Sequence, residues 1–169
     1  MVHGKYFTSS GDIAPILALR KEVFCDEQGF DPALERDKYD DMAFYALVYD
    51  ENEKPAATGR LFIDGQNRFH IGRMCTRKDC RGQGYGDLAI RMLLDLALRQ
   101  NAPYIVADAQ LPAVGFYAKY GFKPCGEIFL DEGVEHQPLR IEAGEIVLGG
   151  HCGGNCAACA EDCPSREQE

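Results

Sequence analysis

The feature that most constrains this chain is a glycine-rich stretch, residues 71–86, with the sequence IGRMCTRKDCRGQGYG. An apolar, strand-like segment leads through a basic turn into three alternate glycines, and a long amphipathic helix begins there. Glycine accepts positive φ and lets a ligand approach the main chain, while a helix N-terminus supplies free amides. The pattern predicts a phosphate-binding turn with Arg77, Lys78 and Arg81 as cations at its rim.

Two kinds of phosphate-binding turn use glycines in this way. Residues 84–89 fit the dinucleotide fingerprint G-x-G-x-x-A, and Asp108 follows about where a ribose-binding acid is expected. In a dinucleotide fold an apolar strand leads almost directly into the first glycine, whereas here residues 76–81 form a polar linker. Too little chain follows to build the remaining strand and helix units, so we set this interpretation aside.

Composition favours one globular domain and argues against a nucleic-acid partner. The 169 residues are 46% hydrophobic, which suits a single domain with a full core. The net charge of −9 argues against a nucleic-acid partner. Charge is segregated, since residues 26–41 hold seven acids and two basic residues, whereas residues 73–81 hold four basic residues and one acid. We therefore expect an anionic cofactor at the basic segment and a cationic acceptor near the acidic one.

The cysteines point to reduced thiols or metal ligands. The chain has eight cysteines, shows no secretory leader pattern and has no apolar run of membrane-spanning length, so we expect a cytoplasmic protein without a membrane partner. Composition changes near residue 143, and residues 144–169 form a predicted cysteine-rich tail. Four thiolates in one short segment are compatible with zinc, although a reduced tail without metal stays open. The candidate ligands are Cys152, Cys156, Cys159 and Cys163.

Hydrophobic periodicity predicts an α/β domain over residues 1–143. The expected strands are residues 5–8, 43–49, 56–63, 68–76, 103–107, 122–129 and 137–142. The expected helices are residues 13–28, 85–100 and 112–120, the first ending at Gly29, with an irregular loop or a short helix in the acidic segment. Together they predict a mixed, mostly antiparallel sheet with a central βαβ unit and helices on both faces.

Three segments, in the same order, resemble the GNAT superfamily of N-acetyltransferases. Residues 81–86 fit its acetyl-CoA signature (Q/R)-x-x-G-x-(G/A). Residues 113–122 resemble its A-x-x-F-Y-x-x-x-G-F helix and strand start, and residues 19–28 resemble a first helix with L-R-x-x-V-F-x-x-E-Q. The resemblance covers roughly residues 5–143 and implies a GNAT-like fold with acetyl-CoA as the cosubstrate.

The resemblance also implies direct attack of the acceptor amine on the acetyl thioester. The acyl oxygen is then stabilised by a main-chain N–H of the strand before the glycine turn, and Tyr117 is the general acid for the departing thiolate. A covalent route through Cys75 is disfavoured, because no activating base adjoins it in the sequence. The implied acetyl-CoA-binding residues are Met74, Cys75, Thr76, Arg81, Gly82, Gln83, Gly84, Tyr85, Gly86, Gln110 and Tyr117.

The general base is less determined by the sequence. Glu27, near the end of the first helix, and His136, before the last strand, are the candidates, since a carboxylate or an imidazole can take a proton from an amine. Asp37 or Asp40 could do so or bind a cationic acceptor, and a solvated acidic face is the alternative for them. Asp108 is expected to face the opening that holds acetyl-CoA.

We therefore expect an acetyl-CoA-dependent N-acetyltransferase that modifies a primary amine of a small molecule, with a peptide amine as an option. The alternative, from another class, is a non-catalytic acetyl-CoA-binding module whose cysteine tail binds a metal or a partner. The acceptor's identity and the oligomeric state stay open, a homodimer included.

Overall fold

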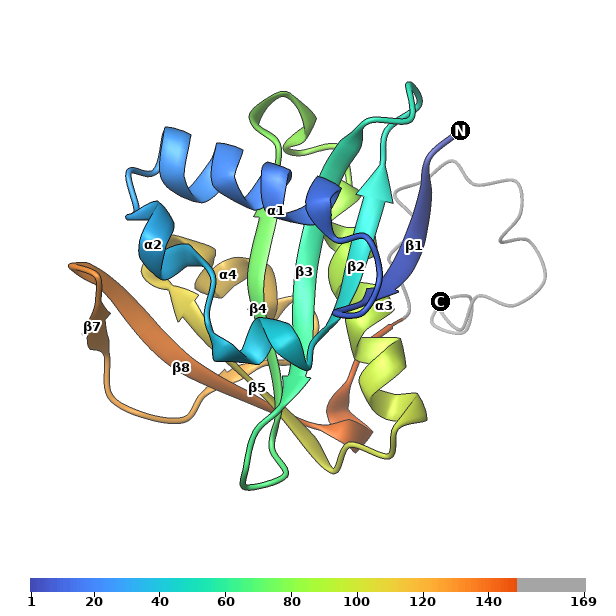
Figure 1. The fold of residues 1–169 in the computed structure, drawn as a ribbon. Coiled ribbons are helices and arrows are strands. Elements are labelled where there is room, and N and C mark those ends of the chain that lie inside the picture. Colours follow the sequence, from blue (N-terminus) through green and yellow to red (C-terminus); the bar gives the residue numbers. More distant parts are fainter. Residues whose placement is uncertain (149–169) are drawn as a thin grey trace, which may run out of the picture.

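The computed structural model describes residues 1–148, and within them an eight-stranded mixed sheet carries helices on both faces (Figure 1). The strands run in the order β1-β2-β3-β4-β5-β8-β6, and β7 also pairs with β8. Only β4 and β5 pair in parallel, so the predicted mixed, mostly antiparallel α/β sheet is confirmed. The strands are β1 (His3–Thr8), β2 (Phe44–Tyr49), β3 (Pro55–Ile63), β4 (Phe69–Thr76), β5 (Tyr104–Gln110), β6 (Lys123–Pro124), β7 (Phe129–Asp131) and β8 (Val134–Glu142).

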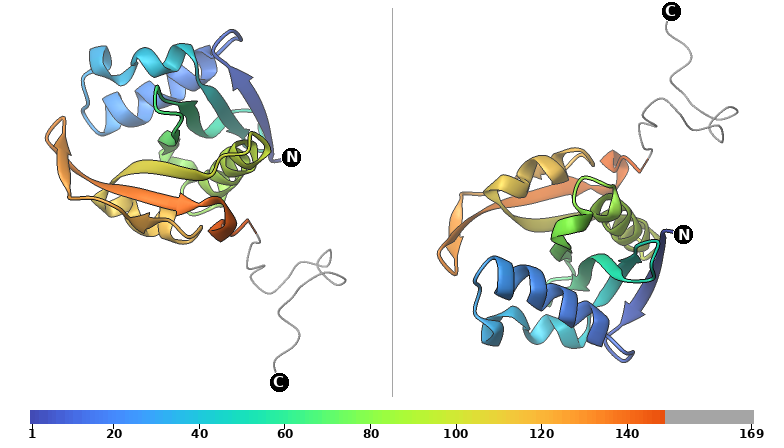
Figure 2. Two further views of the ribbon diagram at one scale, coloured as in Figure 1. Left: turned by 90° about the horizontal axis from the view of Figure 1, so that it is seen from below. Right: turned by 90° about the horizontal axis from the view of Figure 1, so that it is seen from above.

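Successive strand residues point to opposite faces of the sheet, so helices pack against both faces. In β2, Tyr45 and Leu47 pack with the first helix, whereas Ala46 packs with the long helix behind the sheet. Figure 2 shows these helices on either side of the strands. The helices are α1 (Ala14–Arg20), α2 (Pro32–Glu35), α3 (Tyr85–Arg99) and α4 (Val114–Ala118).

The predicted first helix is present, but its second half is wider than an α-helix. After α1, Lys21–Glu27 is π-helical, and the chain turns at Gly29, whose φ of 79° is the left-handed conformation predicted for that stop. The helix crosses over β3 and β4 and ends beside α2 (Figure 1).

A bulge in β4 separates it from β5. Opposite Gly59 the register of β3 and β4 shifts, and Arg73 takes a φ of 50°. Gly59 cannot carry a side chain there, because a Cβ would lie 2.1 Å from Met74 Sδ. Parallel pairing of β4 with β5 is restricted to Phe69 and His70, and beyond them the two strands diverge. The opening between them lies at the end of β4 that leads into the glycine turn.

The chain after α4 differs from the prediction. The expected strand over residues 122–129 is not continuous, since Lys123–Pro124 pairs with β8 as β6, Phe129 begins β7, and the residues between them are outside any strand. Residues 129–142 instead form a hairpin of β7 and β8, whose turn places Glu132 and Gly133 at φ values of 48° and 78°. Positive φ at two successive residues is typical of a type I′ hairpin turn. The hairpin extends over the same side of the sheet as α1 and α2 (Figure 2).

A buried ionic network fixes the acidic segment against β3. Arg20 Nη1 donates to Asp40 Oδ1 at 2.7 Å, and Arg60 donates to both oxygens of Asp37, at 2.7 and 2.9 Å. Arg60 also lies 2.9 Å from Asp40, which is fully buried, and Arg20 contacts Glu35. Burial opposes ionisation of Asp40 and Asp37, but the bonds with Arg20 and Arg60 outweigh it and lower both pKa values. Both carboxylates, which we considered as proton acceptors, therefore form structural ion pairs.

The folded unit continues past the boundary expected at residue 143, because Ile146 and Leu148 pack against the core beside α3. Among residues 1–148 there is no helix with the length and apolarity that crossing a membrane requires. Nor does this part of the chain group three or more His, Cys, Asp or Glu side chains in a way that could hold a metal ion. The predicted ligands Cys152, Cys156, Cys159 and Cys163 lie outside the described residues.

Candidate active site

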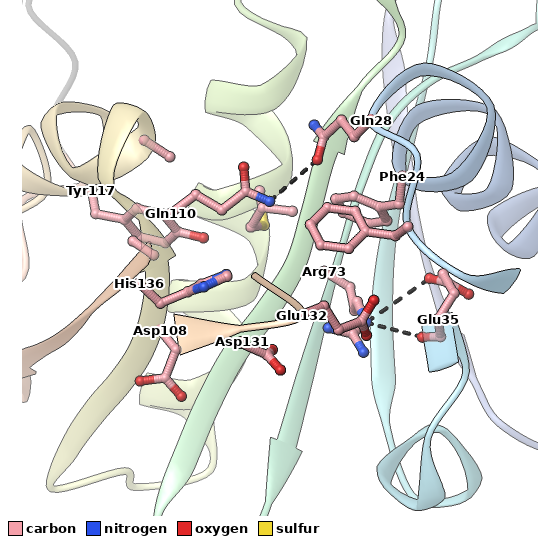
Figure 3. Close-up of a pocket in the computed structure, with 14 residues that line it drawn as sticks. Phe24, Gln28, Glu35, Arg73, Asp108, Gln110, Tyr117, Asp131, Glu132 and His136 are labelled. Carbon is pink, nitrogen blue, oxygen red and sulfur yellow. Dashed lines mark hydrogen bonds and ion pairs between the residues drawn. The ribbon is translucent and has the colours of Figure 1, made fainter. Parts of the chain in front are cut away.

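Two cavities open where β4 and β5 diverge, and they share a wall. We call the first the carboxylate cavity, because Glu35, Asp108, Asp131 and Glu132 line it (Figure 3). The second, the glycine-turn cavity, reaches Thr76, Arg81 and Gly86. The residues common to both linings are Gln28, Met74, Ala113 and Tyr117. A molecule that fills one cavity therefore meets a molecule in the other beside these side chains.

The glycine-turn cavity ends at a helix N-terminus suited to an anion. Gly84 is the N-cap of α3 and has a φ of 86°, which a residue with a Cβ rarely adopts. A Cβ on Gly86 would lie 2.8 Å from Thr76 Oγ1, so the first turn of α3 packs tightly against the end of β4. The first amides of a helix have no intrahelical acceptor and carry the positive end of its dipole. The geometry fits a diphosphate bound by the main chain.

The side chains of this turn are largely engaged with the protein. Gln83 donates to the carbonyl of Asp79 at 2.7 Å, and Tyr85 is buried in the core. Arg81 donates to both carboxylate oxygens of Glu27, each at 2.7 Å, and to the carbonyl of Thr76 at 3.1 Å. What Gln83 and Tyr85 offer a ligand is therefore their main-chain N–H groups.

Glu27, which the sequence offered as a candidate general base, is paired with Arg81. The bonds from Arg81 lower its pKa, which makes the carboxylate a weaker proton acceptor. Glu27 also lies at the glycine turn and is not part of the lining of the carboxylate cavity. It ties the end of the first helix to the phosphate-binding turn.

The end of β4 forms the wall between the two cavities. Met74 lines both, and Cys75 and Thr76 line the glycine-turn cavity. Since β5 has diverged here, main-chain N–H groups on that edge of β4 are available to a ligand's carbonyl oxygen. Burial raises the pKa of the Cys75 thiol to about 12, so the nucleophilic thiolate is negligible at neutral pH. This agrees with the sequence argument against a covalent intermediate on Cys75.

Tyr117 is the side chain best placed to act in both cavities. Tyr117 is 5% exposed, and its hydroxyl has no hydrogen-bond partner within the described part of the chain. Its ring is held edge-on between Phe116 and Phe122. Burial, assisted by the charge of Asp108, raises its pKa and keeps the hydroxyl protonated. This fixed, protonated hydroxyl can therefore donate a hydrogen bond to a ligand at the junction.

His136 presents a free ring nitrogen to the carboxylate cavity. Its Nδ1 lies 2.9 Å from the carbonyl oxygen of Val134, which can only accept, so Nδ1 carries the hydrogen in the neutral ring. Nε2 then keeps its lone pair and can take a proton. His136 pairs with Gln110 across the sheet and stacks on Phe129. These contacts fix the ring beside the opening.

Several residues of this site were missed by sequence reasoning or given another place. Gln110, expected to bind acetyl-CoA, lines the carboxylate cavity and donates to Gln28 at 3.2 Å. Asp131 and Glu132 come from the hairpin that the sequence analysis did not predict, although Asp-Glu-Gly is a turn signal that could have revealed it. Phe24 and Gln28 line the cavity because the first helix widens before its end.

The comparisons with known proteins identify the family to which this chain is similar. The family described as the acetyltransferase (GNAT) domain matches residues 16–143. The uncharacterised protein YyaT of Bacillus subtilis is 30% identical over 141 residues, which cover 82% of this chain and 94% of that protein. The uncharacterised N-acetyltransferase YjcF of the same organism is 34% identical over 120 residues, covering 70% and 84%. A solved structure from Lactobacillus plantarum superposes with a TM-score of 0.76 at 26% identity, covering 84% and 98%.

The family match spans most of the chain, and the mixed sheet with its helices superposes on the solved structure from Lactobacillus plantarum. The dinucleotide interpretation of residues 84–89 is thereby excluded. The chain belongs to the GNAT superfamily of acetyltransferases, and it is accordingly an acyltransferase that uses an acyl-CoA cosubstrate.

Proposed function

We propose that the protein transfers an acetyl group from acetyl-CoA to a primary amine of a small molecule by direct attack. The observation that carries the proposal is the junction of the two cavities at Met74 and Tyr117. The glycine-turn cavity suits the diphosphate and pantetheine of the donor, and the carboxylate cavity suits a cationic amine. With both filled, the thioester and the amine meet beside Tyr117, which supplies the proximity that bimolecular acyl transfer needs.

In this reaction the amine nitrogen forms a bond to the acyl carbon while the carbon–sulfur bond breaks. The oxyanion that develops accepts a hydrogen bond from a main-chain N–H of β4 near Met74 or Cys75. Tyr117 Oη donates to the departing sulfur, so that the products are an amide and the free thiol. The acceptor enters as an ammonium ion and loses two protons in total, of which one ends on the thiol and the other passes through His136 Nε2 to solvent.

The size and charge of the carboxylate cavity favour a small acceptor. Its volume is about 190 Å³, and Glu35, Asp108, Asp131 and Glu132 outnumber Arg73 as charged groups in its lining. An ammonium ion is attracted to such a cavity and an anionic amine is repelled. We therefore rank small cationic amines first and a peptide N-terminus second.

The test combines turnover with binding. Purified protein is incubated with acetyl-CoA and a panel of primary amines, and thiol release and the acetylated product are followed together. The proposal predicts amine-dependent thiol release with a matching amount of N-acetylated amine. Thermal stabilisation by CoA and acetyl-CoA, without stabilisation by NAD, is the accompanying expectation. Stabilisation by acetyl-CoA without transfer to any amine would instead support the non-catalytic binding module.

A further inference from the structure

One carboxylate of the cavity has no partner in the protein. Asp108 lies on β5, and within residues 1–148 it makes no hydrogen bond or ion pair. Arg68 and His70, which are among the groups acting on Asp108, contact Asp64 instead, at 2.7 and 2.9 Å. Arg73, across the cavity, donates to the carbonyl of Glu35 at 3.1 Å. Asp108 is therefore a charge that the fold leaves uncompensated.

The surroundings of Asp108 oppose its ionisation. Loss of hydration within the cavity wall raises its pKa, and the nearby charge of Asp131 adds to the effect, while His70, His136 and Arg68 act against it. The Asp108 residue is nevertheless exposed, so it stands at the rim of the cavity and keeps part of its hydration. A cation bound in the cavity would pair with this carboxylate, which has no such partner among the described residues.

The register of the sheet separates Asp108 from the reacting centre. Gln110 pairs with His136, whereas Asp108 pairs with Pro138, one same-face step further along β5. Such a step is about 7 Å long. Figure 3 shows the Asp108 carboxylate on the side of His136 away from Gln110 and Tyr117. Asp108 thus lies too far along the strand to accompany the amine that meets the thioester.

Tyr117 lies at the opposite end of the carboxylate cavity from Asp108 and gives a second, independent observation. Its hydroxyl, on a side chain that is 95% buried, has no protein partner in the described residues and faces the junction of the cavities. The cavity therefore presents an unpaired donor at one end and an unpaired carboxylate at the other. Asp131 and Glu132 line it too, and residues 1–148 hold no hydrogen-bond or ion-pair partner for either side chain.

We propose that Asp108 anchors a second positive charge on the acceptor, so that the preferred substrates are small diamines and related dications. This proposal rests on the proposed function, because the first amine is the one acetylated beside Tyr117. Asp131 and Glu132 reinforce the negative potential around the second ammonium group. An alkyl chain of about five carbons spans the interval between the two positions, and Phe24 and Phe30 offer it apolar surface.

The experiment compares three amines of equal length: cadaverine, aminopentanol and pentylamine. Binding of each to the protein saturated with CoA is measured by calorimetry, and acetylation of each by acetyl-CoA is measured under steady-state conditions. Wild-type protein is expected to bind cadaverine about tenfold or more tightly than pentylamine, since a bond between charged groups is being added. Asp108→Asn should abolish this preference by weakening the binding of cadaverine about tenfold, with a much smaller loss for pentylamine and no change in the KM for acetyl-CoA.

The matched control is Asp95→Asn, which removes the same charge from the exposed pair with Arg99 on α3. It should keep the preference for cadaverine. No preference in the wild type, or a preference that survives in Asp108→Asn, would overturn the proposal. Acetylation of all three amines at equal efficiency would exclude Asp108 as an anchor and support the proposed function. Selective binding of cadaverine without acetylation of any amine would support Asp108 as an anchor and exclude the proposed function.

Discussion

The carboxylates beneath α1 and those of the carboxylate cavity carry the same charge but differ in what surrounds them. Asp40 and Asp37 are held by Arg20 and Arg60 at 2.7 to 2.9 Å. Asp108 and its neighbours on the β7–β8 hairpin have no such partners in the described chain. Asp37 and Asp40 of the acidic segment are thus neutralised by the protein itself. The side chains of Asp108, Asp131 and Glu132 line the cavity without a partner in the described residues.

The largest effect is expected where the paired carboxylate is neutralised. Asp40→Asn leaves the buried Arg20 with Glu35 as its remaining counter-charge, and breaking a buried pair in this way costs about 3 kcal/mol of unfolding free energy. Denaturant unfolding measures the loss. Asp41→Asn, in the exposed pair with Arg36, is the matched control and should change stability by less than about 0.5 kcal/mol. Equal losses in both variants would contradict the structural role of Asp40.

The same pair predicts a pH dependence with a definite sign. The pKa of Asp40 is lower in the folded protein than in the unfolded chain, so its stabilising contribution is complete above the ordinary carboxylate value of about 3.9 and is lost as pH falls through the folded value. The difference in Tm between wild type and Asp40→Asn should be constant from neutral pH down to about pH 5 and shrink below about pH 4. A difference that shrinks between pH 8 and 6 would point to another group.

Tyrosine hydroxyls allow the same comparison of paired and unpaired groups. Tyr117→Phe should lower kcat about a hundredfold with little change in stability, because its hydroxyl has no partner in the described chain and acts only on the leaving sulfur. Tyr120→Phe removes a hydroxyl that donates to Asp87, so it should cost about 1 kcal/mol of stability with kcat retained. The measurements are the turnover number and the thermal unfolding of both variants. An unchanged kcat in Tyr117→Phe would exclude it as the acid.

Removing the unpaired carboxylate should not harm the fold. Asp108→Asn is expected to leave Tm unchanged or slightly raised at neutral pH, since the ionised side chain gains nothing from the described protein. Thermal unfolding with and without CoA is the measurement. A clear fall in Tm, comparable to that of Asp40→Asn, would mean that Asp108 has a structural partner.

The smallest effect is expected at Glu27, which the sequence presented as a candidate base. Its ion pair with Arg81 is partly exposed, so Glu27→Gln should leave kcat unchanged and lower the KM for acetyl-CoA by about threefold at most, by freeing Arg81 for the diphosphate. Steady-state kinetics at low and high salt measure this. A hundredfold fall in kcat would restore Glu27 as the proton acceptor.

Local signals explain which parts of the molecule were predictable. The N-cap of α3 needs glycine at position 84 because its φ is positive, and position 86 needs glycine because it lies close to Thr76. The glycine pattern of the sequence marks both positions. The hairpins between β2, β3 and β4 follow from their turn residues, and α3 follows from its apolar stripe. The Phe-Tyr pair of α4 led directly to Tyr117.

The remaining features depend on contacts between distant segments. Whether Asp40 or Asp108 is paired depends on arginines of α1 and β3 that no local pattern connects to them. The bulge at Arg73, which opens the sheet, arises from the register of β3 and β4. Strand pairing of β7 was missed because its three residues are too short to show alternation. Among the acids of residues 26–41, Glu35 lines the carboxylate cavity, whereas Asp37 and Asp40 are held in ion pairs.

A crystal structure of the complex with CoA and cadaverine tests the account most directly. The account predicts the diphosphate on the main-chain amides of residues 82–86, the sulfur within hydrogen-bond distance of Tyr117 Oη, and one ammonium group on Asp108. A CoA bound elsewhere, or a sulfur remote from Tyr117 with those amides turned into the protein, would contradict it.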